Sequence, residues 1–86
     1  MDGRVAILGI VVEQESSVEP LNRLLSEYGS YIVGRMGIPY RARGVNLISV
    51  VMDAPGDKIS ALSGKLGMLP GISAKAVYAK LPEEKA

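Results

Sequence analysis

The fold is decided first by residues 4–13, which read Arg-Val-Ala-Ile-Leu-Gly-Ile-Val-Val-Glu. The run is rich in β-branched residues, which favour the extended backbone of a strand. A second run of the same kind, Val-Asn-Leu-Ile-Ser-Val-Val-Met, occupies residues 45–52. We therefore expect two strongly apolar strands, one early and one in the middle of the chain.

The segment that follows the first run predicts a helix. Apolar residues recur at helical spacing from Val18 to Tyr28, and Gly29 is a typical helix stop. Ser16 and Glu19 have the spacing of a capping box, in which each side chain satisfies a backbone N–H of the other residue. We therefore expect this pair to begin the helix.

The remaining elements complete a known supersecondary pattern. In chain order they are a strand over 31–37, a turn over 38–44, the strand over 45–52, a helix capped by Asp53 with the stripe Ile59, Leu62 and Leu66, and a strand over 72–80. The order β-α-β-β-α-β predicts an α+β, ferredoxin-like plait, with two helices on one face of a four-stranded antiparallel sheet. We expect one domain over residues 1–81 and a charged tail over 82–86.

The two central strands are apolar on both faces. Along the first strand Val5, Ile7 and Val11 point one way, while the residues between them, which are also apolar, point the other way. A sheet with helices on one face should instead alternate apolar and polar residues. We therefore expect the uncovered face, or an edge strand, to pack against another copy of the chain in a homo-oligomer, either a dimer or a tetramer.

Composition argues against several classes of function. The 86 residues contain no His and no Cys, so the commonest general base, the thiolate nucleophile and the soft metal ligands are missing. We therefore expect no metal, no cofactor and no catalytic residues. An acid–base enzyme using Asp53 or a Glu with Lys65 is a remaining, weaker alternative.

Charge and hydropathy set the expected compartment. The net charge is only +1 and the chain has no Phe or Trp, which argues against direct nucleic-acid binding. No run approaches the roughly 20 apolar residues of a membrane span, and the apolar run near the start lacks the features of a signal peptide. We expect a cytoplasmic protein that does not bind membranes.

One group of side chains is a candidate ligand site. Arg35, Tyr40, Arg41 and Arg43 lie around the predicted hairpin, and guanidinium groups beside a tyrosine can hold a carboxylate or a phosphate. The alternative is a solvated basic loop that discourages edge-to-edge aggregation. Both interpretations stay open at this point.

Three long motifs carry a family resemblance. They are Ile32-Val-Gly-Arg-Met-Gly-Ile-Pro-Tyr40, Ile48-Ser-Val-Val-Met-Asp-Ala-Pro55 and Ser60-Ala-Leu-Ser-Gly-Lys-Leu-Gly-Met-Leu-Pro-Gly71. With them the chain resembles, over nearly its whole length, the small bacterial proteins named as regulators of the iron-only hydrogenase system. The resemblance implies an ACT-like, ferredoxin-like fold and a regulatory role.

The expected fold is also similar to the C-terminal sensor domain of nickel-responsive repressors. Those sensors bind nickel through His and Cys, which this chain lacks, so no metal ligand carries over. ACT domains that bind amino acids usually have a glycine in the loop after the first strand, and residues 13–17 contain none.

Together, these features favour a regulatory module that senses a small effector at a subunit interface and works with a separate DNA-binding or regulatory protein. The alternative is a docking or oligomerisation module that binds no ligand.

Overall fold

Four strands form one antiparallel sheet in the order β2-β3-β1-β4. The structure is a computed structural model that describes residues 3–80. The strands are β1 (Gly3–Val12), β2 (Ile32–Tyr40), β3 (Val45–Pro55) and β4 (Ile72–Tyr78). The two apolar runs therefore occupy the centre of the sheet, as the sequence predicts.

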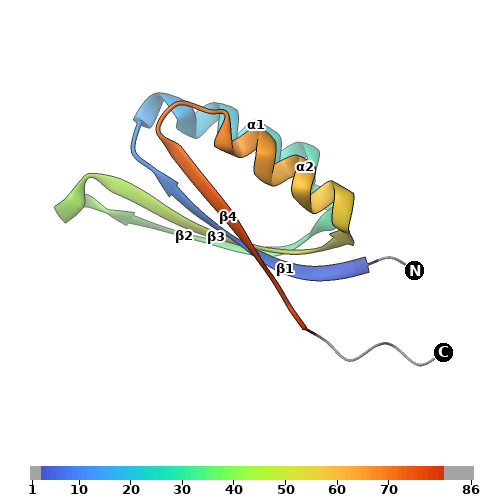
Figure 1. Cartoon of the computed structure of the whole chain (residues 1–86). Helices are drawn as coiled ribbons and strands as arrows, with labels where there is room; N and C mark the ends of the chain where they lie inside the picture. Colours follow the sequence, from blue (N-terminus) through green and yellow to red (C-terminus); the bar gives the residue numbers. More distant parts are fainter. Residues whose placement is uncertain (1–2, 81–86) are drawn as a thin grey trace.

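Two helices lie side by side along one face of this sheet (Figure 1). They are α1 (Val18–Glu27) and α2 (Gly56–Gly67), and three short 3₁₀ turns, Glu15–Ser17, Gly29–Tyr31 and Arg41–Arg43, complete the chain order. This α+β arrangement is the ferredoxin-like plait, so the predicted fold class is confirmed. The hairpin between β2 and β3 extends beyond the end of the helices (Figure 1).

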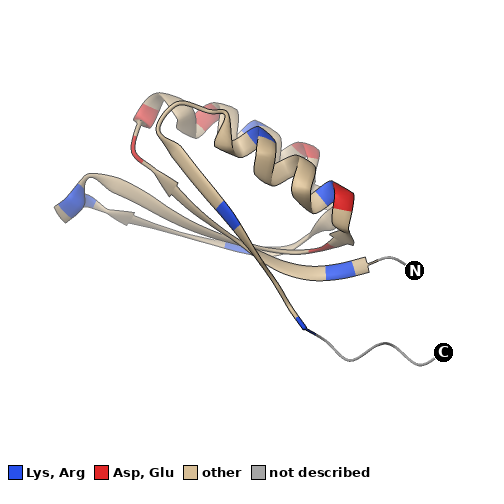
Figure 2. Ribbon diagram, in the orientation of Figure 1, with Lys and Arg blue, Asp and Glu red and all other residues tan. Residues whose placement is uncertain are grey.

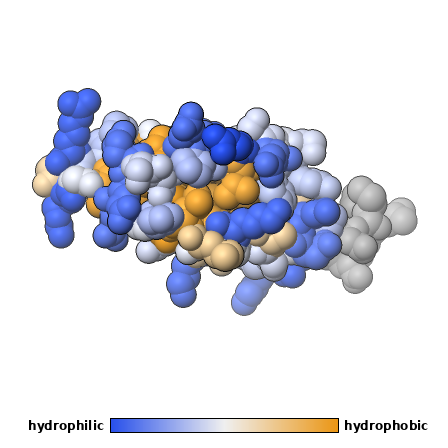
Figure 3. All heavy atoms as spheres, turned by 90° about the horizontal axis from the view of Figure 1, so that it is seen from above, coloured by the Kyte–Doolittle hydropathy of each residue, from blue (hydrophilic) through white to orange (hydrophobic). Residues whose placement is uncertain are grey.

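The core lies between the helices and the sheet face that they cover. The sheet contributes every second residue of β1, from Ala6 to Val12, and Val50 and Met52 of β3. The helices contribute Leu21 and Leu25 of α1 and Ile59, Leu62 and Leu66 of α2. Seen from above, the outer surface on the helix side is largely hydrophilic, with apolar atoms visible toward its middle (Figure 3). The helices thus bury one apolar face of the sheet and present a mostly polar surface to solvent.

The predicted capping box at the start of α1 is wrong. The helix begins at Val18, and its N-cap, Ser17, makes no side-chain capping bond. Instead, the buried Ser17 hydroxyl donates a hydrogen bond to the carbonyl of Pro70. A 3₁₀ turn over Glu15–Ser17 precedes the helix, so the exposed Ser16 lies before the capping position. The need to satisfy a buried hydroxyl outweighs the local capping pattern here.

Strand β2 is longer than predicted, because it continues through residues 38–40 where a turn is expected. Pro39 lies opposite Asn46 within the ladder. A proline cannot donate a ladder hydrogen bond, but β2 is an edge strand, and its outer side needs no donor. The turn is therefore confined to Arg41–Arg43 and to Gly44, whose φ of 67° is in the left-handed region.

The predicted N-cap at Asp53 is also wrong. Strand β3 continues to Pro55, and Asp53 lies in it opposite Val5 of β1. Helix α2 begins at Gly56 without a side-chain cap. Pairing with the long central strand β1 extends β3 past the point where local signals predict a helix.

Two further expectations meet the limits of the described chain. The charged tail predicted over 82–86 lies outside residues 3–80. Within those residues, no helix is long and apolar enough to cross a membrane.

Candidate functional site

The sheet face opposite the helices, here called the open face, carries apolar side chains from all four strands. The register places Ile38 of β2, Leu47 of β3 and Val11 of β1 in one row across the strands. Gly34, Val51, Ile7 and Val77 form a second row. Six large apolar side chains of the open face are exposed to solvent: Ile7, Met36, Ile38, Tyr40, Leu47 and Val77. The two-sided apolar pattern predicted from the sequence is present.

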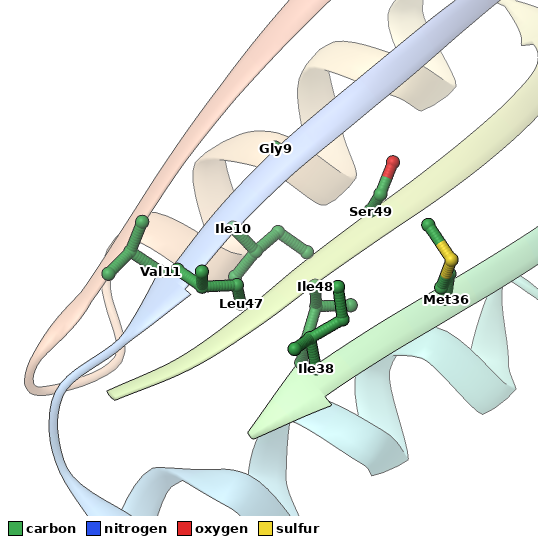
Figure 4. A pocket seen from close by; sticks show the side chains of 8 residues that line it. All are labelled: Gly9, Ile10, Val11, Met36, Ile38, Leu47, Ile48 and Ser49. Carbon is green, nitrogen blue, oxygen red and sulfur yellow. The ribbon is translucent and has the colours of Figure 1, made fainter. Parts of the chain in front are cut away.

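A hollow of about 260 Å³ lies at the centre of the open face. Figure 4 shows its lining, which is Gly9, Ile10, Val11, Met36, Ile38, Leu47, Ile48 and Ser49. Between the two apolar rows, the middle row has Ser49 and Gly9 as neighbours on β3 and β1. Because these two residues have small side chains, they leave space on the surface of the central strands. The larger side chains of Met36 and Ile38 on β2 border this space. The hollow is almost entirely apolar, so it suits hydrocarbon side chains better than a charged ligand.

The structure separates Arg35 from the rest of the predicted basic cluster. Arg35 lies opposite Val50, so it points to the helix side of the sheet. There its guanidinium group donates a hydrogen bond of 3.1 Å to Oδ1 of Asn22 on α1. Both residues line a second cavity of about 260 Å³, between α1 and the β2–β3 hairpin.

Tyr40 and Arg41 lie together at the tip of the hairpin. Tyr40 is opposite Val45 and closes the end of the open face. With Arg41 it lines a cavity of about 440 Å³, whose other walls are Glu15, Pro39, Gly44, Val45 and Asn46. Arg43 belongs to the same 3₁₀ turn but not to the cavity wall. The basic residues at this tip are visible in Figure 2.

Of the groups considered for acid–base chemistry, Asp53 and Lys65 lie on opposite sides of the sheet, whereas the Glu27 carboxylate lies near enough to Lys65 to contribute to its raised pKa. Asp53 is on the open face, opposite Val5. Lys65 is on α2, on the other side of the sheet, where its Nζ lies 5.3 Å from the centre of the Tyr28 ring. A hydrogen bond with the Tyr28 hydroxyl raises the pKa of Lys65. The structure therefore does not bring Asp53 and Lys65 together in one site.

No cluster of metal ligands is found within residues 3–80, where no three His, Cys, Asp or Glu side chains come together. The described surface offers apolar contact on the open face and charge-assisted hydrogen bonds at the hairpin. Sequence reasoning missed the Arg35–Asn22 contact and the central hollow. Strand parity could have placed Arg35 on the helix side, once the pairing with β3 was known.

Comparison with known proteins identifies the family. Residues 4–76 match the model of the TM1266-like family, described as "Iron-only hydrogenase system regulator, putative". The chain belongs to this family. The match runs from β1 into β4, so it includes both the open face and the hairpin. No protein of curated function matches the chain.

Solved structures agree with the TM1266-like assignment. The chain is similar to uncharacterized protein TM1266 from Thermotoga maritima, with 38% identity, a TM-score of 0.87, and coverage of 91% of this chain and 99% of that one. It also resembles part of a formyltetrahydrofolate deformylase from Pseudomonas putida KT2440. That match has 18% identity, a TM-score of 0.61, and coverage of 85% of this chain and 28% of the other. The second likeness shows the fold alone.

Proposed function

We propose that this member of the TM1266-like family is a non-catalytic regulatory module that binds a small anionic effector at the edge of a subunit interface. One observation carries the proposal: the cavity lined by Tyr40 and Arg41 lies on the helix side of the hairpin, where Glu15, Pro39 and Asn46 also line it, and it shares two residues with the open face. Tyr40 and Val45 form both a wall of that cavity and the last row of the open face. A ligand held there would contact Tyr40 and Val45 and would act through them on a molecule packed on the open face.

The cavity walls indicate the chemistry of the effector. The Arg41 guanidinium can form paired, charge-assisted hydrogen bonds with a carboxylate or a phosphate. The Tyr40 hydroxyl and the Asn46 amide add neutral hydrogen-bonding groups, and Pro39 and Val45 add apolar surface. Glu15 on the same wall would repel a ligand of high negative charge. An effector with a single anionic group and a small apolar body therefore fits better than a polyphosphate.

Regulation of transcription by this module would require a DNA-binding element outside residues 3–80. Residues 3–80 are used entirely by the plait, and their two helices are separated by strands rather than paired as a helix-turn-helix. We therefore include a separate DNA-binding or regulatory partner in the proposal. The link to an iron-only hydrogenase system comes from the family description.

A thermal-shift screen of the purified protein against organic acids, amino acids, nucleotides and divalent metals tests the proposal. An effector at 100 times its dissociation constant adds about 2.7 kcal/mol of stability. For a domain of this size, we expect the melting temperature to rise by roughly 10 °C or more. The double variant Arg41→Ala/Arg43→Ala should lose the shift. The matched control Arg23→Ala/Lys58→Ala removes two exposed basic residues from the helices and should keep it.

A hit that survives in the hairpin variant would remove Arg41 and Arg43 from the site. A second function, a docking module without a ligand, is favoured by the apolar hollow on the open face, which offers little to a polar effector. A flat response across the whole screen, together with recovery of one stoichiometric protein partner from an effector-free sample, would favour that alternative.

A further inference from the structure

The exposed large apolar side chains are concentrated on the open face. Two others, Val33 and Met68, lie elsewhere: Val33 is in the bulge of β2 and Met68 follows α2. Monomeric proteins rarely expose a continuous apolar patch that spans a whole sheet. The cost of hydrating this surface favours a partner that covers it.

The size of the open face suits a small dimer interface. Four strands spaced about 4.8 Å apart and seven to eleven residues long give a projected area of roughly 600 Å². Specific interfaces bury about 600–1,000 Å² on each partner. Face-to-face packing would therefore use nearly the whole sheet and leave little apolar area exposed.

We infer that the partner is a second copy of this chain, packed sheet against sheet around a two-fold axis that crosses the strands above Ser49 and Gly9. Two copies of one face can meet only if the axis lies in the plane between them. When the strands of the two sheets are aligned, the axis runs close either to the strand direction or to its perpendicular. The inference gives a location to the subunit interface in the proposed function, but it does not depend on the effector.

Charge placement selects the axis across the strands. The hairpin end of the sheet carries Arg41 and Arg43 (Figure 2). The opposite end carries Asp53 on the open face, and the neighbouring Arg4, opposite Ala54, points to the helix side. Ser49 lies midway between Val45 and Asp53 along β3. An axis across the strands at Ser49 therefore brings the basic hairpin of each copy over the open-face carboxylate Asp53 of the other. An axis along the strands would place the two basic ends together, which is unfavourable.

One charge on the open face opposes this arrangement only weakly. Lys75 lies opposite Gly9 at the outer edge, on β4, so the two copies bring their Lys75 side chains toward each other. Its exposed position on an edge strand lets the long stem carry the ammonium group out into water. The interior of the face, over β1 and β3, has no charged residue between Val5 and Val11 or between Val45 and Val51.

The central hollow leaves room at the interface for side chains of the second copy. An added Cβ at Gly9 would meet no atom within 4 Å, so this glycine is not required for packing within one chain. Ladder geometry does not require it either, because its φ is not positive. A residue without a side chain at the centre of a strand weakens that strand, but it leaves room for the side chains of another molecule. Apolar side chains of the second copy would fill the hollow.

A pair of methionine variants tests the interface. Met36→Lys places a charge on the open face, and Met68→Lys makes the same chemical change outside it; the two methionines are 61% and 84% exposed. Light scattering and sedimentation of the effector-free protein at micromolar concentrations should show a dimer for the parent chain and for Met68→Lys. Met36→Lys should raise the dissociation constant of the dimer at least tenfold. A monomeric parent chain would overturn the proposal, as would equal dimerisation by all three proteins.

Two further variants separate sheet-face packing from pairing through an edge strand. Gly9→Arg places a charged side chain at the hollow, and its Cβ would meet no atom within 4 Å in the monomer; circular dichroism would check that the variant folds. It should abolish the dimer; a dimer that persists joins through another surface, and the proposal fails. Asp53→Arg should weaken association, and Arg43→Asp in the same chain should restore it. Unchanged or tighter association of Asp53→Arg would overturn the axis across the strands.

This test is independent of the effector. A flat thermal-shift screen with an intact dimer would count against the proposed sensing role alone. A monomer that still binds an anion at Arg41 would count against the dimer alone.

Discussion

The two faces of the sheet are built from neighbouring residues of the same strands but have different fates. Leu8 on the helix side is fully buried, whereas Ile7 beside it is 47% exposed on the open face. The helix side is continuous with the packed core, and its partners are supplied by α1 and α2. The open face has no covering element within residues 3–80 (Figure 1).

The difference shows that apolar content alone does not decide burial. Both helices lie on one side because the two β-α-β crossovers have the same hand. The second apolar face therefore adds little to the folding of one chain and remains available for association. Small residues at its centre, Gly9 and Ser49, are consistent with this role, since the helix side has Leu8 and Val50 at neighbouring positions.

The largest expected effect compares adjacent residues of β1. Leu8→Ala should lower the free energy of unfolding by about 2–5 kcal/mol, because it leaves a cavity in the core. Ile7→Ala should change it by less than about 1 kcal/mol in dilute protein, where the open face is solvated. Urea unfolding of both variants at low concentration measures the contrast. Similar losses from the two substitutions would show that the open face is buried even in the dilute protein.

Two glycines with the same backbone conformation sharpen the comparison between the helix layer and the hairpin. Gly71 and Gly44 have φ values of 70° and 67°. Alanine at Gly44 should cost about 1–2 kcal/mol, the usual penalty for the left-handed region, because space around it is open. Alanine at Gly71 should cost more, since its Cβ would lie 2.6 Å from Cγ and 3.1 Å from the backbone nitrogen of Gln14. Thermal unfolding should give Gly71→Ala a lower melting temperature than Gly44→Ala. The reverse order would contradict the close packing at Gln14.

Two serines provide a smaller test of the same contrast. Ser17→Ala should cost about 1 kcal/mol, because it removes the hydrogen bond to the Pro70 carbonyl in a buried position. Ser49→Ala on the open face should stay within about 0.5 kcal/mol in dilute protein. Chemical denaturation distinguishes the two. A neutral Ser17→Ala would mean that the Pro70 carbonyl finds another donor.

The smallest expected effect is a pH dependence on the outer surface of the helix layer. Since Tyr28 raises the pKa of Lys65 in the folded state, this contact stabilises the fold fully below pH 10.5, the unfolded value. Its contribution is lost as the pH rises through the higher folded value. Stability should therefore fall slightly more steeply above pH 10.5 in the parent chain than in Tyr28→Phe. Parallel pH profiles for the two proteins would show that the contact is absent in solution.

Local signals and nonlocal pairing differ in how well the sequence reveals them. The apolar runs at 4–13 and 45–52 and the stripe Ile59, Leu62 and Leu66 predict their elements correctly, because each reflects a periodicity within a few neighbouring residues. The capping signal at Ser16 fails because a 3₁₀ turn moves the N-cap to the next residue, and the signal at Asp53 fails because this residue pairs in the sheet. Ser17 bonds to Pro70, and Asp53 is drawn into the ladder by Val5.

The candidate site shows the same limit. Arg35, Tyr40, Arg41 and Arg43 are close in the sequence, yet Arg35 and Tyr40 lie on opposite faces of the sheet. The bulge between Ile32 and Gly34 shifts the register of β2 and thereby sets these directions. A one-residue shift of register moves a side chain to the other face, and no local pattern in a weakly apolar edge strand fixes it.

The sequence by itself determines the plait, the central position of its two apolar strands, and the fact that both faces of those strands are apolar. Only the tertiary structure decides which face the helices cover, how Arg35 is held by Asn22, and that Gly9 and Ser49 meet to form a hollow. The physical reason is that periodicity is a property of neighbouring residues. The face to which a side chain points, the register of the strands and the cavities instead depend on contacts between residues far apart in the chain.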